Sequence, residues 1–267
     1  MSGEPTHYVG VDWASGAWVT VVYSSESNTP EIDVFDTIQE VWDVYGETSD
    51  RIVVDIPIGL CEGRDADNCS CVEDDGEIFR ECDDLARSVI AGRYRSVFTP
   101  PARKIARLAT DNDMDHAEIT EKNRKLTGKG LSQQAAGIAS GIVAVEDLLL
   151  DDGNPDVLVE GHPEVCFRAF NGEPLHNSKK TASGVDERLS AISGVEEYNN
   201  NDWRGLAKTL KTEDRNVEID DLLDGLALAL TAFAEGEEDK RLPPEPPTDA
   251  KGLPMQMVYR STTGLLE

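Results

Sequence analysis

The chain has 267 residues, of which 39% are hydrophobic, enough to fill the core of one large domain. It contains 52 acidic and 25 basic residues, so its formal net charge is −27. The apolar content excludes disorder of the whole chain, and the lack of 18 consecutive apolar residues excludes a membrane-spanning helix. The start of the chain has neither the basic nor the apolar region of a signal peptide. We therefore expect a cytoplasmic protein with no membrane partner.

The acidic residues are spread over nearly the whole chain and do not form a block. Such a surface repels itself at low ionic strength, whereas at molar salt the Debye length shrinks to about 3 Å and the repulsion is screened. The composition therefore favours a halophilic protein from a salt-adapted cytosol. The alternative, an acidic tail bound to a basic partner, would need the acids to be clustered.

Five cysteines are an odd number for a chain of this length, which argues against a complete disulfide framework and favours reduced thiols. Cys61, Cys69, Cys71 and Cys82 suggest a zinc site at first sight. The single residue between Cys69 and Cys71 is a poor spacing for tetrahedral zinc, however, so we expect no zinc.

The first part of the chain predicts a strand-rich start to the fold. Apolar runs indicate three antiparallel strands and then, after an amphipathic helix, a fourth strand. These elements are expected at residues 8–12, 17–23, 31–35, 36–45 (the helix) and 51–55. Residues 61–130 are irregular in period and rich in charge, which predicts an insertion wrapped around the sheet.

The second part of the chain predicts a helix, a strand and a further buried helix. The helix begins at about residue 132, the strand covers 156–160, and the buried helix covers 217–233. A C-terminal extension at about 236–267 ends in a short apolar piece that could return to the body. The expected architecture is a single α/β domain over 1–267, with three antiparallel strands, then parallel strands, and flanking helices.

Five carboxylates fall where the predicted strands end or where the last helix begins. They are Asp12, Asp55, Glu160, Asp221 and Asp224. The carboxyl ends of strands line the ligand crevice of an α/β sheet, and acids gathered there repel one another unless cations neutralise them. Mg²⁺ or Mn²⁺ would meet that need, and two such ions can hydrolyse a phosphodiester bond. The alternative is that acids are so abundant that some must end strands, and that Asp at a helix start is ordinary capping.

Basic residues cluster in two acid-free stretches, residues 85–110 and 122–145. One interpretation is that these bases pair with acidic residues across the fold. The other is a phosphate-binding surface, favoured by Tyr94 and Phe98 among the arginines, since aromatic rings stack on nucleobases. The candidate substrate-binding residues are Arg87, Arg93, Arg95, Arg103 and Lys129.

His162 and Glu164 follow the predicted strand at 156–160. His162 could act as a general acid or a ligand, although a lone histidine at a strand end is more often structural. Glu164 could support a metal ligand without touching the ion.

Seven segments of the chain follow one another in the order found in domain-of-unknown-function family 429, which the sequence therefore resembles. They are residues 10–18, 54–60, 82–87, 95–101, 131–134, 160–164 and 221–227. The resemblance covers nearly the whole chain and points to a haloarchaeal-type member. That family is predicted to consist of RNase H-like nucleases, so the resemblance implies an RNase H-like fold and activity on nucleic acid.

The last helix also resembles the end of Holliday-junction resolvases of the same fold, where an Asp-x-x-Asp pair supplies metal ligands. Carried over, Asp12 would bridge two Mg²⁺ or Mn²⁺ ions, and Asp221 and Asp224 would complete the site. Asp55 and Glu160 compete for one further ligand position.

The sequence departs from the pattern of these relatives at Trp13, where a smaller residue would leave more room, and at Gly225, where alanine is commoner. Neither departure removes a carboxylate. The expected function is a metal-dependent nuclease acting on DNA or RNA. The alternatives are a non-catalytic nucleic-acid-binding module, and a phosphotransferase or ATPase that uses the same fold.

Overall fold

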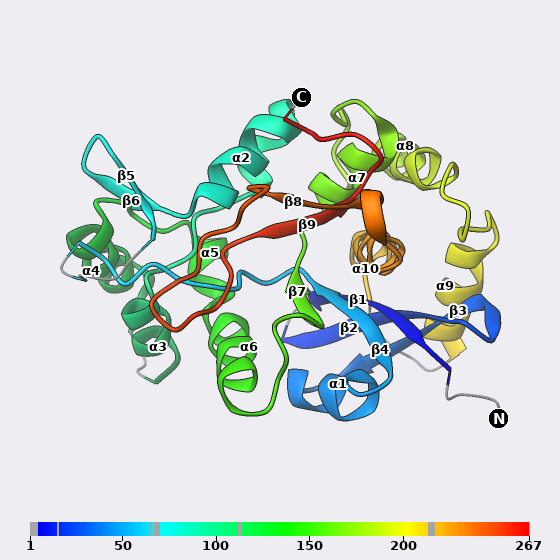
Figure 1. Cartoon of the computed structure of the whole chain (residues 1–267), viewed down its shortest axis with the longest axis horizontal. Coiled ribbons are helices and arrows are strands. Elements are labelled where there is room, and N and C mark those ends of the chain that lie inside the picture. Colours follow the sequence, from blue (N-terminus) through cyan, green and yellow to red (C-terminus); the bar gives the residue numbers. More distant parts are fainter. Residues whose placement is uncertain are drawn as a thin grey trace.

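A five-stranded mixed sheet lies at the centre of the molecule (Figure 1). In the computed structural model its strands have the order β3-β2-β1-β4-β7. They are β1 (His7–Ala14), β2 (Ala17–Ser24), β3 (Ser27–Phe35), β4 (Ser49–Val54) and β7 (Leu158–Glu160). The first three pair antiparallel, whereas β1 pairs with β4 and β4 with β7 in parallel. The chain is therefore α/β with an RNase H-like mixed sheet, which confirms the predicted fold class.

The structure describes most of the chain. The described residues are 5–14, 16–64, 66, 70–111, 114–212 and 217–266.

Helices cover both faces of the sheet, because each strand at its centre is apolar on both sides. On one face pack α1 (Ile38–Tyr45) and α6 (Ala139–Asp151), around Val9, Val11 and Ile52. The other face is covered by four further helices. They are α7 (Pro163–Asn171), α8 (Ala182–Ile192), α9 (Asp202–Thr212) and α10 (Ile219–Ala232). Across the described ranges, no helix is both long enough and apolar enough to cross a membrane.

The segment predicted as an insertion, residues 61–130, contains regular elements. They are β5 (Val72–Asp74), β6 (Glu77–Phe79), α2 (Glu81–Ile90), the 3-10 turn η1 (Ala91–Ser96), α3 (Arg103–Asp111) and α4 (His116–Thr127). In Figure 1 the β5-β6 hairpin, α3 and α4 form one side of the molecule, beyond α6. The expectation of an irregular segment missed these helices, whose buried faces are short and carry charged residues.

The helix expected from residue 132 is divided in two at Ile138. The short α5 (Gln133–Gly137) ends there and α6 begins, because Ile138 leaves the helical conformation with φ −91° and ψ 3°. The C-terminal extension does return to the body: after η2 (Gly236–Glu238), β8 (Asp239–Leu242) pairs with β9 (Met257–Arg260). A bridge from Gly161 to Val258 attaches this hairpin beside β7.

The expectation of reduced thiols is wrong for one pair of cysteines. Cys61 and Cys71 form a disulfide, because the chain returns through the insertion and brings their Cα atoms to 6.0 Å. Cys82 and Cys166 are free and buried, and Cys69 lies outside the described residues.

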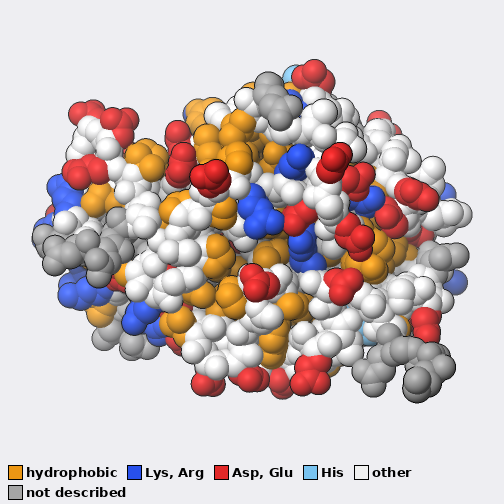
Figure 2. Space-filling model, in the orientation of Figure 1, with side chains coloured by type: hydrophobic (Ala, Val, Ile, Leu, Met, Phe, Trp, Pro, Cys, Tyr) orange, Lys and Arg blue, Asp and Glu red, His pale blue; other side chains and the backbone are white. Residues whose placement is uncertain are grey.

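The charge of −27 leads to a first testable expectation. Figure 2 shows acidic side chains scattered over one face of the molecule with fewer basic ones among them. When KCl falls below roughly molar concentration, the repulsion is no longer screened and should exceed a net stability of about 5–15 kcal/mol. We expect the melting temperature, followed by circular dichroism, to fall steadily as the KCl concentration is lowered. A melting temperature that stays constant down to dilute buffer would contradict the halophilic interpretation.

Candidate active site

Asp12 and Asp55 lie side by side because β1 and β4 are parallel and in register. Val11 pairs with Val54, and the amide of Asp55 donates to the carbonyl of Val11 at 2.9 Å. Side chains alternate between the two faces of a strand. Val11 and Val54 belong to the core on the α1 and α6 side, so Asp12 and Asp55 point to the α10 side.

A glycine lets α10 approach β1 closely enough to bring a third carboxylate to this place. A Cβ atom on Gly10 would lie only 2.2 Å from the amide nitrogen of Ala229 and from the carbonyl of Gly225. Gly225 in turn faces Val21, whose Cγ2 would be 3.0 Å from an added Cβ. The two glycines therefore allow direct backbone contact, and Asp224 lies next to one of them.

The two acids of the last helix have different surroundings. Asp221 is half-buried and accepts a hydrogen bond from the amide of Glu218 at 3.1 Å, which makes it part of the helix cap. Asp224 is only 3% exposed. Its Oδ2 accepts from Nζ of Lys179 at 2.5 Å, and its Oδ1 is buried with no hydrogen-bond partner among the residues that the structure describes.

Burial raises the pKa of all three carboxylates, and neighbouring acids add to the shift at Asp12 and Asp224. Burial raises the pKa of Asp12 well above its usual range, and the charges of Asp224 and Asp55 raise it further. Burial likewise raises the pKa of Asp55. For Asp224, burial raises the pKa to about 6 although Lys179 acts in the opposite direction.

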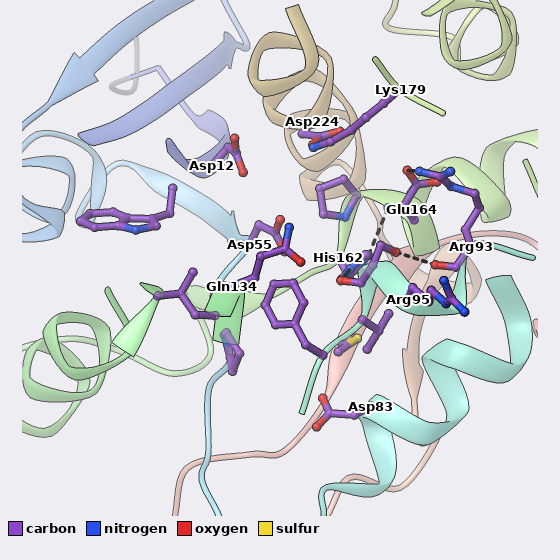
Figure 3. A pocket seen from close by; sticks show the side chains of 18 of the residues that line it. Asp12, Asp55, Asp83, Arg93, Arg95, Gln134, His162, Glu164, Lys179 and Asp224 are labelled. Atoms are coloured by element: carbon purple, nitrogen blue, oxygen red, sulfur yellow. Dashed lines mark hydrogen bonds and ion pairs between the residues drawn. The ribbon is translucent and has the colours of Figure 1, made fainter. Parts of the chain in front are cut away.

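Lys179 brings a positively charged side chain to these carboxylates. Burial would lower its pKa, but the carboxylates of Asp224 and Asp12 outweigh that effect and raise it. Its ammonium group also lies 3.4 Å from Asp220. Figure 3 shows Asp12, Asp55 and Asp224 at one end of a pocket with Lys179 lying along Asp224. Sequence reasoning missed Lys179, although it stands in an acid-free stretch, residues 174–185, that is too short to be conspicuous.

Glu160 is on the other side of the sheet. It shares its face with Leu158, which belongs to the α1 and α6 core, and the position beside Asp55 is occupied by Gly161. Its carboxylate accepts from Arg80 at 2.7 and 2.8 Å and from the amide of Ile58 at 2.6 Å. Glu160 lines the same pocket, but its side-chain direction separates it from Asp12, so the geometry favours Asp55 as the neighbour of Asp12.

Arg80 is a buried arginine that sequence reasoning also missed. It is 1% exposed and pairs with both Asp83 and Glu160. Burial raises the pKa of Glu160 to about 7, with Arg80 opposing the shift. This ion cluster joins the insertion to the end of β7. It lies on the α1 and α6 side of the sheet, opposite to Asp12 and Asp55.

The five predicted substrate-binding residues divide into two groups. Arg87, Arg103 and Lys129 are bound within the protein and do not line the pocket. Arg87 donates to the carbonyl of Val97 at 2.9 Å, and Lys129 lies 2.8 Å from Glu77. Arg103 and Lys129 pair with acidic residues, as one interpretation expected, whereas the partners of Arg87 are the carbonyl of Val97 and the hydroxyl of Thr99.

Arg103 shows most clearly why a basic residue of these stretches can be unavailable to a substrate. It lies among Glu62, Glu146 and Asp249, with a distance of 2.6 Å to Glu146. It thereby connects the insertion to α6 and to the C-terminal extension. Each of its three guanidinium nitrogens donates to a carboxylate, and the side chain is buried, so a phosphate cannot reach it.

Arg93 and Arg95 do line the pocket, from η1. Figure 3 shows both near His162 and Glu164, at some distance along the pocket from Asp12. The guanidinium of Arg93 lies 3.9 Å from Glu164, and Arg95 lies over the ring of Tyr94.

His162 has a structural role at the start of α7. Its Nδ1 accepts from the amide of Glu164 at 3.2 Å, which leaves Nε2 to donate to the carbonyl of Ser96 at 3.3 Å. Glu164 is held by Arg188 and in turn faces Arg93. The pair therefore holds η1 in place through Ser96 and Arg93.

The pocket that unites these residues has a volume of about 1000 Å³. Asp12, Asp55, Asp221 and Asp224 line it together with Lys179. Other parts of its wall come from η1 of the insertion and from α5 and α6. Asp12, Asp55 and Asp224 thus lie with Lys179 at one end of the pocket, and Arg93 and Arg95 lie with Glu164 at the other.

Among the residues that the structure describes, no group of three or more His, Cys, Asp or Glu side chains is close enough to hold a metal ion as it stands. The donor set nevertheless fits a hard divalent cation, because all its members are carboxylates and the buried Oδ1 of Asp224 has no partner. Lys179 supplies the positive charge in this arrangement.

These pKa shifts predict how cation binding depends on pH. A carboxyl group with a raised folded-state pKa adds stability below its unfolded pKa, and that contribution is lost as the pH rises through its folded value, about 6 for Asp224. A divalent cation must displace those protons. The rise in melting temperature caused by Mg²⁺ should therefore be larger at pH 8 than at pH 5.5, in thermal-shift titrations at fixed KCl. An equal rise in melting temperature at both pH values would mean that the cation binds away from these carboxylates.

Comparison with known proteins identifies the family of the chain. No curated protein and no solved structure matches the chain. The family of proteins of unknown function DUF429 matches residues 10–248, a range that includes Asp12, Asp55 and Asp224. The chain therefore belongs to the DUF429 family.

Proposed function

We propose that the protein is a metal-dependent nuclease that hydrolyses phosphodiester bonds of DNA or RNA. The observation that supports this proposal best is the meeting of Asp12, Asp55 and Asp224 on one face of the sheet, with an unpartnered oxygen of Asp224 buried among them. Burial raises the pKa of all three acids, so their ionised forms are unfavourable together unless a cation is bound. Arg93 and Arg95, which line the same pocket, offer a place for the phosphates of a substrate.

In this proposal Asp12, Asp55 and Asp224 hold Mg²⁺ or Mn²⁺, with Asp221 at the rim. The ions would supply an activated water and stabilise the leaving oxygen. Lys179 neutralises Asp224 in the ion-free protein, and its ammonium group would be free to contact a phosphate oxygen when these carboxylates hold a cation. Arg93 and Arg95 bind the neighbouring phosphates of the strand.

A second candidate is a nucleic-acid-binding module without catalysis. It is favoured by the Lys179–Asp224 pair, which places a fixed positive charge where a metal ion would otherwise neutralise the carboxylates. Such a protein would bind nucleic acid equally well with and without divalent cations.

One experiment separates the two. Purified protein is incubated with single-stranded, duplex and branched oligonucleotides in Mn²⁺ or in EDTA, at a KCl concentration that keeps it folded. Products are resolved on a denaturing gel, and binding is followed by fluorescence anisotropy. Cleavage that needs Mn²⁺ supports the nuclease. Binding without cleavage in either condition would overturn it in favour of the second candidate.

The roles of Arg93 and Arg95 can be tested by charge reversal. Changing both to Glu should weaken oligonucleotide binding by at least about tenfold, because two phosphate contacts become repulsive. The Mg²⁺-induced rise in melting temperature should stay unchanged, since neither residue lies among the carboxylates. A control with the same change in net charge is Arg204→Glu with Lys211→Glu, both exposed on α9. Equal loss of binding in the control would mean that only total charge matters.

A further inference from the structure

We infer that the pocket binds one unpaired nucleobase beside the carboxylates, against a wall made by Trp13, Phe98 and Gln134. This inference rests on the proposed action on nucleic acid and adds the form of the substrate: a single-stranded end or an extruded nucleotide. All three residues line the same pocket as Asp12 and Asp55.

The two aromatic side chains are only partly buried, although their rings are apolar. Trp13 follows Asp12 on β1 and so points to the opposite face, where it packs on Trp18 with ring centroids 4.5 Å apart. Phe98 comes three residues after Arg95 and rests on a small apolar cluster around Ile105. Partly exposed rings that line a pocket are suited to stacking, which is worth about 1–3 kcal/mol per base.

Polar groups for the edge of a base are present on the same side. Gln134 on α5 lines the pocket (Figure 3), and Ser140 lies on the first turn of α6. Both side chains are exposed, and within the described ranges neither takes part in a hydrogen bond. A Cβ atom added to Gly137, between them, would have nothing within 4 Å, so the wall is open there. An amide and a hydroxyl can each donate to and accept from a base edge.

The charges around the pocket indicate that the nucleic-acid strand does not continue past the wall made by Trp13, Phe98 and Gln134. Beyond Trp13 lies a second cavity of about 600 Å³, which shares Trp13 and Ser140 with the first. It is lined by Asp36, Asp147 and Asp151 and by no basic side chain among the described residues. Phosphates are repelled there, whereas Arg93 and Arg95 attract them at the opposite end. The base at the wall is therefore terminal or turned out of a helix, as enzymes that reach a single nucleotide require.

The test measures whether the base contributes to binding. Fluorescence anisotropy compares a labelled thymidine decamer with an abasic decamer that carries the same phosphates, and with the corresponding duplex, in Ca²⁺ and with the oligonucleotide checked for integrity afterwards. The variant is Phe98→Leu, which keeps apolar volume against the cluster around Ile105 but removes the stacking face. Phe79→Leu is the matched control, because Phe79 lies in β6 of the same insertion and outside the pocket.

We expect the wild type to bind the decamer at least about tenfold more tightly than the abasic strand and the duplex. Phe98→Leu should lose most of that difference and Phe79→Leu should keep it. Equal binding of the decamer and the abasic strand would overturn the base site but leave phosphate binding, and with it the proposed function, intact. Tighter binding of the duplex would also overturn it. Failure to bind any of the three strands would overturn both proposals together.

Discussion

Replacing Asp12 by Asn should lower Mn²⁺-dependent cleavage by at least about a thousandfold, on the scale of losses from other groups that stabilise transition-state charge. The amide has nearly the same volume as the carboxylate but no charge with which to hold a cation between β1 and α10. Its effect on folding should be small or favourable. Asp12 is 7% exposed and already has a strongly raised pKa, so a neutral side chain relieves repulsion from Asp224 and Asp55.

The matched control is Asp50→Asn, an exposed acid at the start of β4 and so at the other end of the sheet. It should cleave like the wild type. Circular dichroism and melting curves of both variants would show that the fold is kept. If Asp12→Asn cleaved as fast as Asp50→Asn, the carboxylates would not form the reaction centre.

The same assay distinguishes Asp55 from Glu160. Asp55→Asn should resemble Asp12→Asn, with lost cleavage and an intact fold. Glu160→Gln should instead lower the melting temperature, because Arg80 would lose a charged partner in a buried cluster. Cleavage by the Glu160 variant would then fall only as far as the fraction of folded protein falls.

The ends of β4 and β7 were predicted from the sequence, whereas β1 continues two residues beyond Asp12, to Ala14. The directions of the side chains at these places were not predictable. Asp12, Asp55 and Glu160 all follow apolar runs, and nothing in those runs gives the register between β4 and β7. In the structure Val54 pairs with Glu160, so the residue level with Asp55 is Gly161. A shift of one residue in register would have brought Glu160 to the α10 face.

The basic residues illustrate a different limit of sequence reasoning. The acid-free stretches were visible, yet the acids that neutralise them come from far along the chain. Arg103 pairs with Glu146 and Asp249, at separations of 43 and 146 residues. Only the fold brings such residues together. Arg93 and Arg95 have fewer internal partners, and it is they that line the pocket.

The start of the last helix was predicted together with its two acids, and the structure explains why one of them is deeper. Asp221 caps the helix and stays half-buried, whereas Asp224 lies one turn later, beside Gly225, where α10 touches β1. The glycine that departs from the resolvase pattern is thus what brings Asp224 close. The partner of Asp224 could not be predicted, because Lys179 lies 45 residues earlier, in the segment between α7 and α8.

Replacing Lys179 by Met should lower the melting temperature of the metal-free protein by roughly 5–10 °C. Removing one member of a buried ion pair leaves an uncompensated charge, and here we expect about 2–3 kcal/mol, at or below the usual range because Lys179 is 31% exposed. In a chain of this size each kcal/mol corresponds to about 2–4 °C. The loss is further limited because Asp224, with its pKa raised to about 6, can take up a proton.

The sign of the metal response then shows whether Lys179 occupies the place of a cation. In the Lys179→Met variant, Mg²⁺ no longer competes with the ammonium group, so it should raise the melting temperature more than in the wild type. Lys180→Met is the matched control. Lys180 is 65% exposed and pairs with Glu218 and Asp220 at the surface, where solvent screens the charges, so its loss should lower the melting temperature much less than the loss of Lys179 and leave the metal response unchanged. If both variants responded to Mg²⁺ like the wild type, Lys179 would be a structural partner of Asp224, and the cation would have to bind away from that carboxylate.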